Sequence, residues 1–148
     1  ELQALASGWY ENGTEVIFAC GGPMFDSISA AASAEDAKVI GVDVDQSSQS
    51  PTVITSAMKG IGEAAQQALK AAETEDSWKA FNGDGTQTIV LGAAEGAVGL
   101  PTATWSLSWP VSEYEAMFAD IVAGKLTIDD ADVPEPASTA HVTVNIVK

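Results

Sequence analysis

The hydrophobic positions of this chain switch between helical and strand-like spacing from its first residues onward. Between Leu2 and Tyr10 an apolar residue recurs every three or four positions, which is the spacing of one buried helical face, and Gly13 is expected to end that helix. A continuous apolar run then covers Val16 to Cys20, as expected for a strand that is covered on both faces. The chain is therefore predicted to begin with a helix followed by a buried strand.

The same two patterns repeat through the middle of the chain. Short apolar runs predict strands at Val39 to Val42, Thr52 to Thr55 and Thr88 to Leu91. Helical spacing is present over residues 25–32 and again from Ile61 onward. Strands that alternate with helices at this spacing predict an α/β fold with a parallel, doubly wound sheet.

A further helix is predicted near residue 115. Ser112 and Glu115 have the spacing of a capping box at its start, and Gly124 is expected to end it. Trp105 and Trp109 precede this helix and can stack on a flat ligand, but tryptophans in such places more often cover the edge of a domain.

The two ends of the chain set its expected domain organisation. Because the chain opens directly in a helix, we expect the first strand of this unit, and a further lobe, to precede Glu1. Asp129 to Pro136 is an acidic connector, and His141 to Val147 alternates as expected for a final strand. We therefore expect residues 1–128 to form one ligand-binding lobe and residues 129–148 to form a connector with a terminal strand.

Composition narrows the possible partners. The chain has 6 basic and 21 acidic residues and a formal net charge of −15, so its surface repels phosphate backbones and anionic lipids. It lacks an apolar run near the roughly 20 residues needed to cross a bilayer. We expect no binding of nucleic acid. The single cysteine, Cys20, excludes an internal disulfide, and its apolar neighbours predict a buried thiol.

Residues suited to a binding site follow three of the predicted strands. The glycine pair Gly21–Gly22, the carboxylate Asp43 and the ammonium Lys59 each lie at or just beyond a strand end. In an open α/β sheet, ligands bind outside the carboxyl ends of the strands. Asp43 is the strongest candidate, since a carboxylate can accept hydrogen bonds from two adjacent hydroxyls of a sugar or ribose. The alternative is a loop aspartate that caps its own backbone.

Lys59 and the glycine pair are weaker candidates. Lys59 is expected at the start of a helix, where the dipole disfavours a cation, so a facing carboxylate or a ligand oxygen should offset it. The alternative is a solvated surface lysine. Gly21–Gly22 would let a ligand approach the backbone, but without a full G-x-G-x-x-G pattern the sequence favours a plain tight turn.

Catalytic and metal sites lack necessary parts. The D-V-D opening at Asp43 resembles a calcium loop, but the sixth position has no glycine, and Ile54 occupies the twelfth, where glutamate is needed. His141 is the only histidine, so a Ser-His-Asp triad or a multi-histidine metal site is not expected. We expect no catalytic residue, no metal ion and no cofactor.

Four motifs in a fixed order relate the chain to a known family. They are E-N-G-T-E-V-I-F-A-C-G-G, V-I-G-V-D-V-D-Q, T-V-I-T-S-A-M-K and V-L-G-A-A-E-G-A-V-G-L. With these motifs, and over nearly all of its length to about Leu126, the chain resembles the carboxy-terminal lobe of the basic membrane protein family of bacterial substrate-binding lipoproteins, which includes purine nucleoside receptors. The resemblance implies one lobe of a type I periplasmic-binding-protein fold, with the ligand enclosed between two lobes.

The resemblance also implies a function. The chain would be the extracytoplasmic binding component of an ABC importer, with a lipid anchor upstream, a permease as its partner and a nucleoside as its ligand. The ribose-anchoring carboxylate and lysine of the family would fall on Asp43 and Lys59, with Gly21–Gly22 lining the cleft. Cys20 and Pro23 replace residues that are usually small or glycine around this turn, which changes the local shape of the cleft.

Other functions remain open at the level of sequence. A sugar or autoinducer receptor has the same architecture, and so does the effector domain of a transcription regulator. An enzyme on this fold would need a nucleophile and a base that these residues do not supply, so we do not expect an enzyme.

Overall fold

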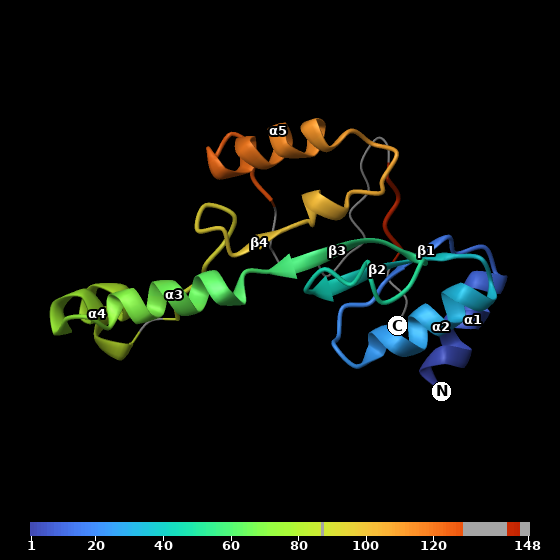
Figure 1. Ribbon diagram of the computed structural model, residues 1–148, viewed down its shortest axis with the longest axis horizontal. Helices are drawn as coiled ribbons and strands as arrows, with labels where there is room; N and C mark the ends of the chain where they lie inside the picture. The colour runs from blue at the N-terminus through green and yellow to red at the C-terminus, as the bar shows by residue number, and fades with distance from the viewer. Residues whose placement is uncertain (87, 129–141, 146–148) are drawn as a thin grey trace.

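A four-stranded sheet forms the centre of the chain (Figure 1). The computed structural model describes residues 1–86, 88–128 and 142–145. The strands lie in the order of the sequence: β1 (Val16–Phe18), β2 (Lys38–Asp43), β3 (Val53–Lys59) and β4 (Val98–Gly99). The pairs β1–β2 and β2–β3 are parallel, and β4 pairs antiparallel with β3. The predicted α/β fold with a parallel sheet is confirmed, and the antiparallel strand β4 is an addition at its edge.

In the described part of the chain, five helices accompany the sheet, and three of them lie against its two sides. They are α1 (Leu2–Glu11), α2 (Met24–Ala34), α3 (Ile61–Ala71), α4 (Glu75–Asn82) and α5 (Val111–Val122), with 3-10 turns η1 (Gly83–Gly85) and η2 (Thr102–Thr104). Figure 1 shows α1 and α2 against one side of the sheet and α5 on the other. The predicted helices correspond to α1, α2, α3 and α5. Gly13, which was expected to end the first helix, follows α1 with a φ of 95°.

The hydrophobic core lies between the sheet and the pair α1–α2. Its buried residues are Ala6, Tyr10, Ile17, Ala19, Phe25, Ile28, Ala31, Ala32, Val39 and Val53. Each fully buried large side chain of this kind stabilises the fold by about 1.5–3 kcal/mol. The Tyr10 hydroxyl donates to the Lys38 carbonyl at 2.8 Å, so α1 is also bonded to the start of β2. This packing fixes the strands whose ends form the candidate site.

The connection between β2 and β3 is unusually short for parallel strands. Such strands normally need about a dozen residues or more, usually with a helix, whereas residues 44–52 contain no helix. The side chain of Gln46 fills the turn, and its Oε1 accepts from Val42 N–H at 2.9 Å. The backbone N–H of Gln46 donates to Ser56 Oγ at 3.0 Å. A Cβ on Gly41 would lie 2.5 Å from Gln46 Oε1 and 2.7 Å from Ser56 Oγ, so only glycine fits there.

The prediction of a strand at Thr88 to Leu91 is wrong. Residues 88–91 have no regular secondary structure, and the fourth strand is β4, within the stretch predicted as a loop. Ile89 and Leu91 instead line a hollow with Ile61 of α3, while Val90 between them is exposed. The apolar run therefore reflects this hollow beside α3 rather than pairing in the sheet.

The capping box predicted at Ser112 and Glu115 is also wrong. α5 begins two residues earlier than that box requires, at Val111, with Pro110 in place of Ser112 as its N-cap residue and no side-chain cap. The carbonyl of Pro110 accepts from Glu113 N–H at 3.0 Å, so Ser112 lies inside the first turn. Gly124 has a φ of 69° after the helix, as expected for the residue that ends it.

The pair α3–α4 extends away from the sheet, as Figure 1 shows. Neither helix has a buried residue, and Leu69 of α3 is 72% exposed. The side chains of Thr74 and Ser77 form a capping box at the start of α4, which the sequence prediction missed. Within the described residues, no helix has both the length and the apolar character that spanning a membrane requires.

The predicted acidic connector, Asp129 to Pro136, lies outside the described residues, as do His141, Ile146 and Val147 of the predicted final strand. The described part of that strand, residues 142–145, has no regular secondary structure.

We predict that Gly41→Ala destabilises the protein by about 1–3 kcal/mol, because the new methyl group would overlap Gln46 and Ser56 in a packed turn. Gly8→Ala is the matched control, since a Cβ there meets nothing within 4 Å and lies inside α1. That control is expected to stabilise the protein by about 0.5–1 kcal/mol. Urea denaturation measures both values, and equal effects at the two positions would contradict the prediction.

Candidate functional site

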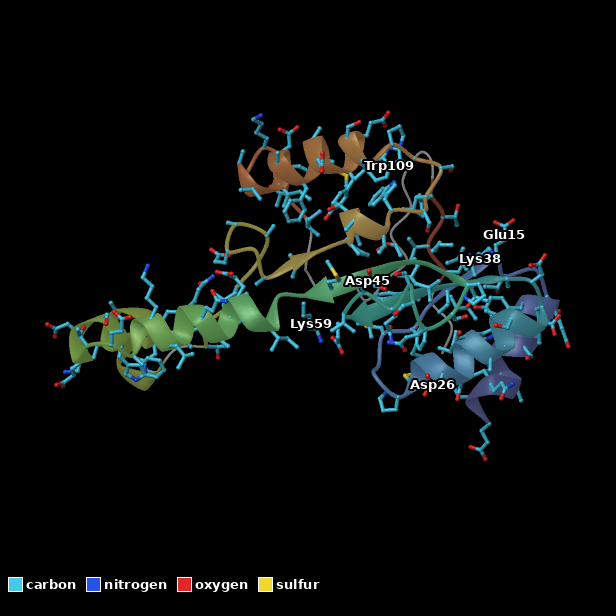
Figure 2. All side chains as sticks on the ribbon, viewed as in Figure 1. Glu15, Asp26, Lys38, Asp45, Lys59 and Trp109 are labelled. Atoms are coloured by element: carbon cyan, nitrogen blue, oxygen red, sulfur yellow. The ribbon has the colours of Figure 1, made fainter. Side chains whose placement is uncertain are left out.

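A hollow of about 350 Å³ lies at the carboxyl ends of the three parallel strands. All four residues proposed from the sequence line it: Gly21 and Gly22 after β1, Asp43 at the end of β2 and Lys59 at the end of β3. In Figure 2, Lys59 lies where β3 passes into α3. The structure thus brings the predicted residues together at the place where parallel sheets bind ligands.

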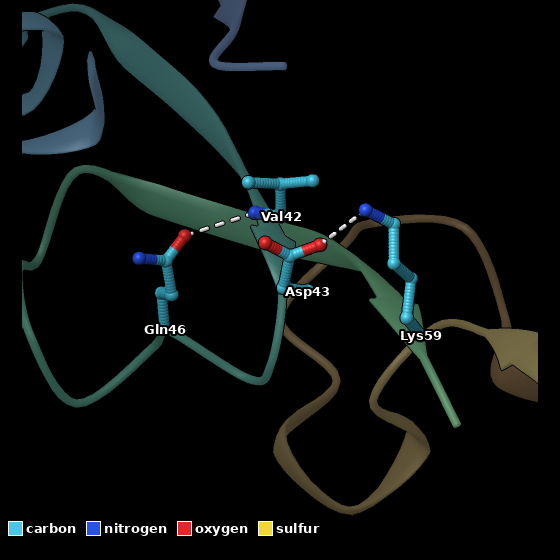
Figure 3. Close-up of polar contacts among 4 residues, drawn as sticks. All are labelled: Val42, Asp43, Gln46 and Lys59. Carbon is cyan, nitrogen blue, oxygen red and sulfur yellow. Dashed lines mark hydrogen bonds and ion pairs between the residues drawn. The ribbon is translucent and has the colours of Figure 1, made fainter. Parts of the chain in front are cut away.

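Asp43 and Lys59 form an ion pair inside this hollow. Lys59 Nζ lies 2.8 Å from Asp43 Oδ1, with the lysine side chain 64% exposed and the aspartate side chain 37% exposed (Figure 3). The ammonium does not approach along a hydrogen-bonding direction, so the buried Oδ1 has a charge partner without a well-directed hydrogen bond. Among the described residues, Asp43 has no other polar partner for its side chain.

The position of Lys59 corrects the sequence prediction. It was expected at the start of a helix, but it is the last residue of β3, and α3 begins two residues later, at Ile61. The facing carboxylate that was expected to offset its charge is Asp43. Contact with this carboxylate and its negative charge together raise the pKa of Lys59 above its ordinary value of 10.5. Lys59 therefore keeps its positive charge at neutral pH.

Apolar side chains complete the hollow. They come from the strand ends and from β4: Phe18, Val42, Ala57, Met58 and Val98, together with Gly99 and Cys20. The β4 residues could not be recognised from the sequence, because the fourth strand was expected elsewhere. Phe18 and Val42 lie in predicted strands, whereas Ala57 lies beyond the predicted strand Thr52 to Thr55, because β3 continues to Lys59.

Cys20 is exposed, so the prediction of a buried core thiol is wrong. β1 ends at Phe18, and Cys20 N–H turns back to bond the Phe18 carbonyl at 3.1 Å. The thiol therefore lies beyond the strand, at the wall of the hollow.

A larger groove of about 590 Å³ lies between α5 and β4, and it shares Met58, Val98 and Gly99 with the hollow. Its lining is apolar apart from Thr102, the Tyr114 hydroxyl and Glu115, so it lacks the pair of opposite charges. We therefore take the smaller hollow as the candidate site.

The two tryptophans lie outside the hollow. Figure 2 shows Trp109 beside α5. Trp105 and Trp109 lie 6.0 Å apart between ring centroids and both pack against Tyr114, and Trp109 Nε1 donates to Glu113 at 2.7 Å. They cover the start of α5, which is the commoner of the two roles considered for them.

Comparison with known proteins decides the family. The family model named Bmp, described as ABC transporter substrate-binding protein PnrA-like, matches residues 2–131. The chain belongs to this family. Comparison with curated proteins gave no significant match.

The chemistry of the hollow agrees with a Bmp protein. Its family consists of substrate-binding proteins of ABC transporters and is not a family of enzymes. In ABC importers such proteins act outside the cytoplasm. The hollow offers an acceptor, a cation and an apolar wall, which are binding groups. In the part of the chain that the structure describes, no cluster of three or more histidine, cysteine or acidic side chains could hold a metal ion.

Asp45, the second carboxylate of the D-V-D motif, has a different role in this Bmp chain. Its Oδ1 accepts from Ser47 N–H at 3.0 Å, and its Oδ2 accepts from the Thr104 hydroxyl at 2.7 Å. These bonds, with the backbone bond from Ser47 contributing most, lower the pKa of Asp45 below its ordinary value of 3.8. Asp45 thereby ties the β2–β3 connection to η2, while Asp43 faces the hollow.

We predict that Thr104→Val destabilises the protein slightly at neutral pH and that this loss shrinks in acid. A carboxyl whose pKa is lowered by folding stabilises the fold above its ordinary pKa, and this stability disappears as the pH falls through the folded value. Urea midpoints of wild type and Thr104→Val at about pH 7 and about pH 2.5 test this expectation. A difference that stayed constant with pH would show that Asp45 does not mediate the effect.

Proposed function

We propose that the hollow is one wall of a binding site for a purine nucleoside that an ABC importer takes up. In this proposal Asp43 accepts hydrogen bonds from ribose hydroxyls and Lys59 donates to a ligand oxygen. Gly21 and Gly22 let the ligand lie close to the backbone. The observation that best supports the proposal is the combination of a charged end and an apolar wall in one hollow.

The charged end suits the two adjacent hydroxyls of a ribose. A carboxylate has about four acceptor positions, and Lys59 is the one described partner of Asp43. Hydrogen bonds to a charged group are worth about 1.5–3 kcal/mol, which is more than neutral ones contribute. A ribose diol can therefore bind Asp43 without displacing Lys59.

The apolar wall favours a nucleoside over a free sugar. Phe18, Val42 and Ala57 line the hollow beside the ion pair. A sugar with hydroxyls on every side would place some of them against these side chains without partners, which is costly. A purine has apolar faces that can lie on such a wall. A sugar receptor of the same architecture remains the alternative that the experiment must separate.

We further propose that a second lobe closes over this wall. Excluding water would strengthen the few polar bonds, because hydrogen bonds and ion pairs are stronger in a low-dielectric site. A site that is open on one side leaves the ligand half in water, so residues 1–148 alone are expected to bind weakly. In the complete protein, a lipid anchor would keep the closed complex at the membrane for delivery to the permease.

The ligand class is tested by calorimetric titration of the full-length mature protein. Inosine, adenosine and guanosine are the ligands, and ribose and glucose are the controls. We expect the nucleosides to bind and free ribose not to bind measurably, since the apolar wall would then be unused. Binding of a sugar but of no nucleoside would favour the sugar-receptor alternative. If none of the five compounds bound, both the nucleoside proposal and the sugar alternative would be contradicted.

We predict that Asp43→Asn weakens inosine binding roughly 10- to 100-fold, because it removes the charge and one acceptor from the ribose end of the site. Asparagine is chosen because, like aspartate, it tolerates the positive φ of 69° at this position. Asp45→Asn is the matched control: its carboxylate bonds to Ser47 and Thr104 and does not line the hollow. Equal losses in the two variants would contradict the role given to Asp43.

A further inference from the structure

The backbone at Asp43 has a conformation that non-glycine residues rarely adopt. Its φ is +69°, and Val44 N–H donates to the Val42 carbonyl at 2.8 Å across it. This is a one-residue turn of the positive-φ kind, which is the rarer and more strained type. Strained residues of this kind persist only where the surrounding structure fixes them, and they concentrate at functional sites. The contacts that fix Asp43 therefore bear on the ligand site.

Gln46 supplies these contacts from the far side of the turn. Its Oε1 accepts from Val42 N–H, directly before Asp43 (Figure 3). Its backbone N–H donates to Ser56 Oγ on β3. Gln46 is 8% exposed and Ser56 is fully buried, so water does not compete for these bonds. The turn that contains Asp43 is thus bonded to β2 at one side and to β3 at the other.

The end of β1 explains why Val42 needs a side-chain acceptor. β1 ends with Phe18 opposite Ile40, and Ala19 N–H bonds the Ile40 carbonyl. Groups two residues further along a strand point to the same side, so Val42 N–H points past the end of β1. A buried N–H without a partner is costly, and the Gln46 amide oxygen takes the place of the missing strand. Gly41 leaves room for this oxygen.

We propose that Gln46 is a positioning residue for the ligand site, which keeps Asp43 in its left-handed conformation so that the carboxylate faces Lys59 and the ligand. Gln46 does not line the hollow, so it acts through Asp43 and not by touching the ligand. Without the side-chain bond to Val42, Asp43 relaxes to an ordinary negative φ, and its carboxylate turns away from Lys59. The ligand readout below rests on the proposed nucleoside function, while a second readout does not.

The test compares Gln46→Met with wild type in the full-length protein. Methionine has a similar length and volume but lacks the amide oxygen that accepts from Val42. The readout is the ratio of the Kd for 2′,3′-dideoxyinosine to the Kd for inosine, because only inosine offers ribose hydroxyls to Asp43. We expect Gln46→Met to reduce this ratio roughly 10- to 100-fold, as expected when a carboxylate no longer accepts from the diol. Loss of stability alone would weaken both ligands equally and leave the ratio unchanged, which would overturn the proposal.

Two further variants separate the proposed role from general damage. Gln49→Met is the matched control, because Gln49 is exposed and its side chain bonds, among the described residues, only the Nε2 of Gln46, at 3.4 Å, so the ratio should stay at the wild-type value. Gln46→Glu retains an oxygen that can accept from Val42 and should recover part of the ratio that Gln46→Met loses. A ratio that falls equally in Gln49→Met, or a complete lack of recovery in Gln46→Glu, would count against positioning through the Val42 bond.

The second readout is the titration of Lys59, followed by NMR of its side-chain nitrogen without any ligand. Asp43 raises the pKa of Lys59, so this pKa should fall toward its ordinary value in Gln46→Met and stay raised in Gln49→Met. If wild type does not distinguish inosine from its dideoxy analogue, the nucleoside proposal fails, and this titration still decides the role of Gln46. An unchanged Lys59 pKa in Gln46→Met would overturn that role whatever the ligand is.

Discussion

The short connection between β2 and β3 is the constraint on which the rest of the site depends. Two parallel neighbours joined without a helix force the chain to reverse its path within residues 44–52. The backbone groups left over at this reversal must find partners inside the protein. Gln46 and Ser56 supply them, and Gly41 provides the space. Asp43 at the tip of β2 and Lys59 at the tip of β3 come to face one another because the two parallel strands pair up to their ends, with Asp43 opposite Met58.

The ion pair at these tips is well suited to a ligand site and poorly suited to stabilising the fold. Both side chains are partly exposed, and exposed ion pairs contribute little to stability because water and salt screen them. The same two charges become stronger partners when a bound molecule and a covering surface exclude water. In a chain with a formal net charge of −15, a lysine kept beside a carboxylate also gives the hollow a local charge unlike that of the average surface.

Much of this arrangement follows from the sequence, and the misses have identifiable physical causes. Apolar periodicity predicted α1, α2, α3 and the three parallel strands, because each of these elements has a pattern that a helix or a buried strand requires. The same reasoning failed for Thr88 to Leu91, since a short apolar run also occurs where a segment without regular structure lines a hollow beside a helix. The positions of Gly21, Gly22, Asp43 and Lys59 followed from the strand-end rule. The positive φ of Asp43 and the bonds of Gln46 did not, because a hydrophobic pattern does not say which polar side chain will bond a backbone group in a turn.

The pair α3–α4 has a consequence for how the chain unfolds. Both helices are short, neither has a buried residue, and isolated helices of this length are marginally stable in water. The strands and α1–α2, by contrast, share one packed core. Cooperative unfolding is therefore expected only for the elements that share that core. The arm of α3 and α4 can open and close at little cost in free energy while β2 stays folded, so its amides should exchange with solvent far sooner than those of the central strands.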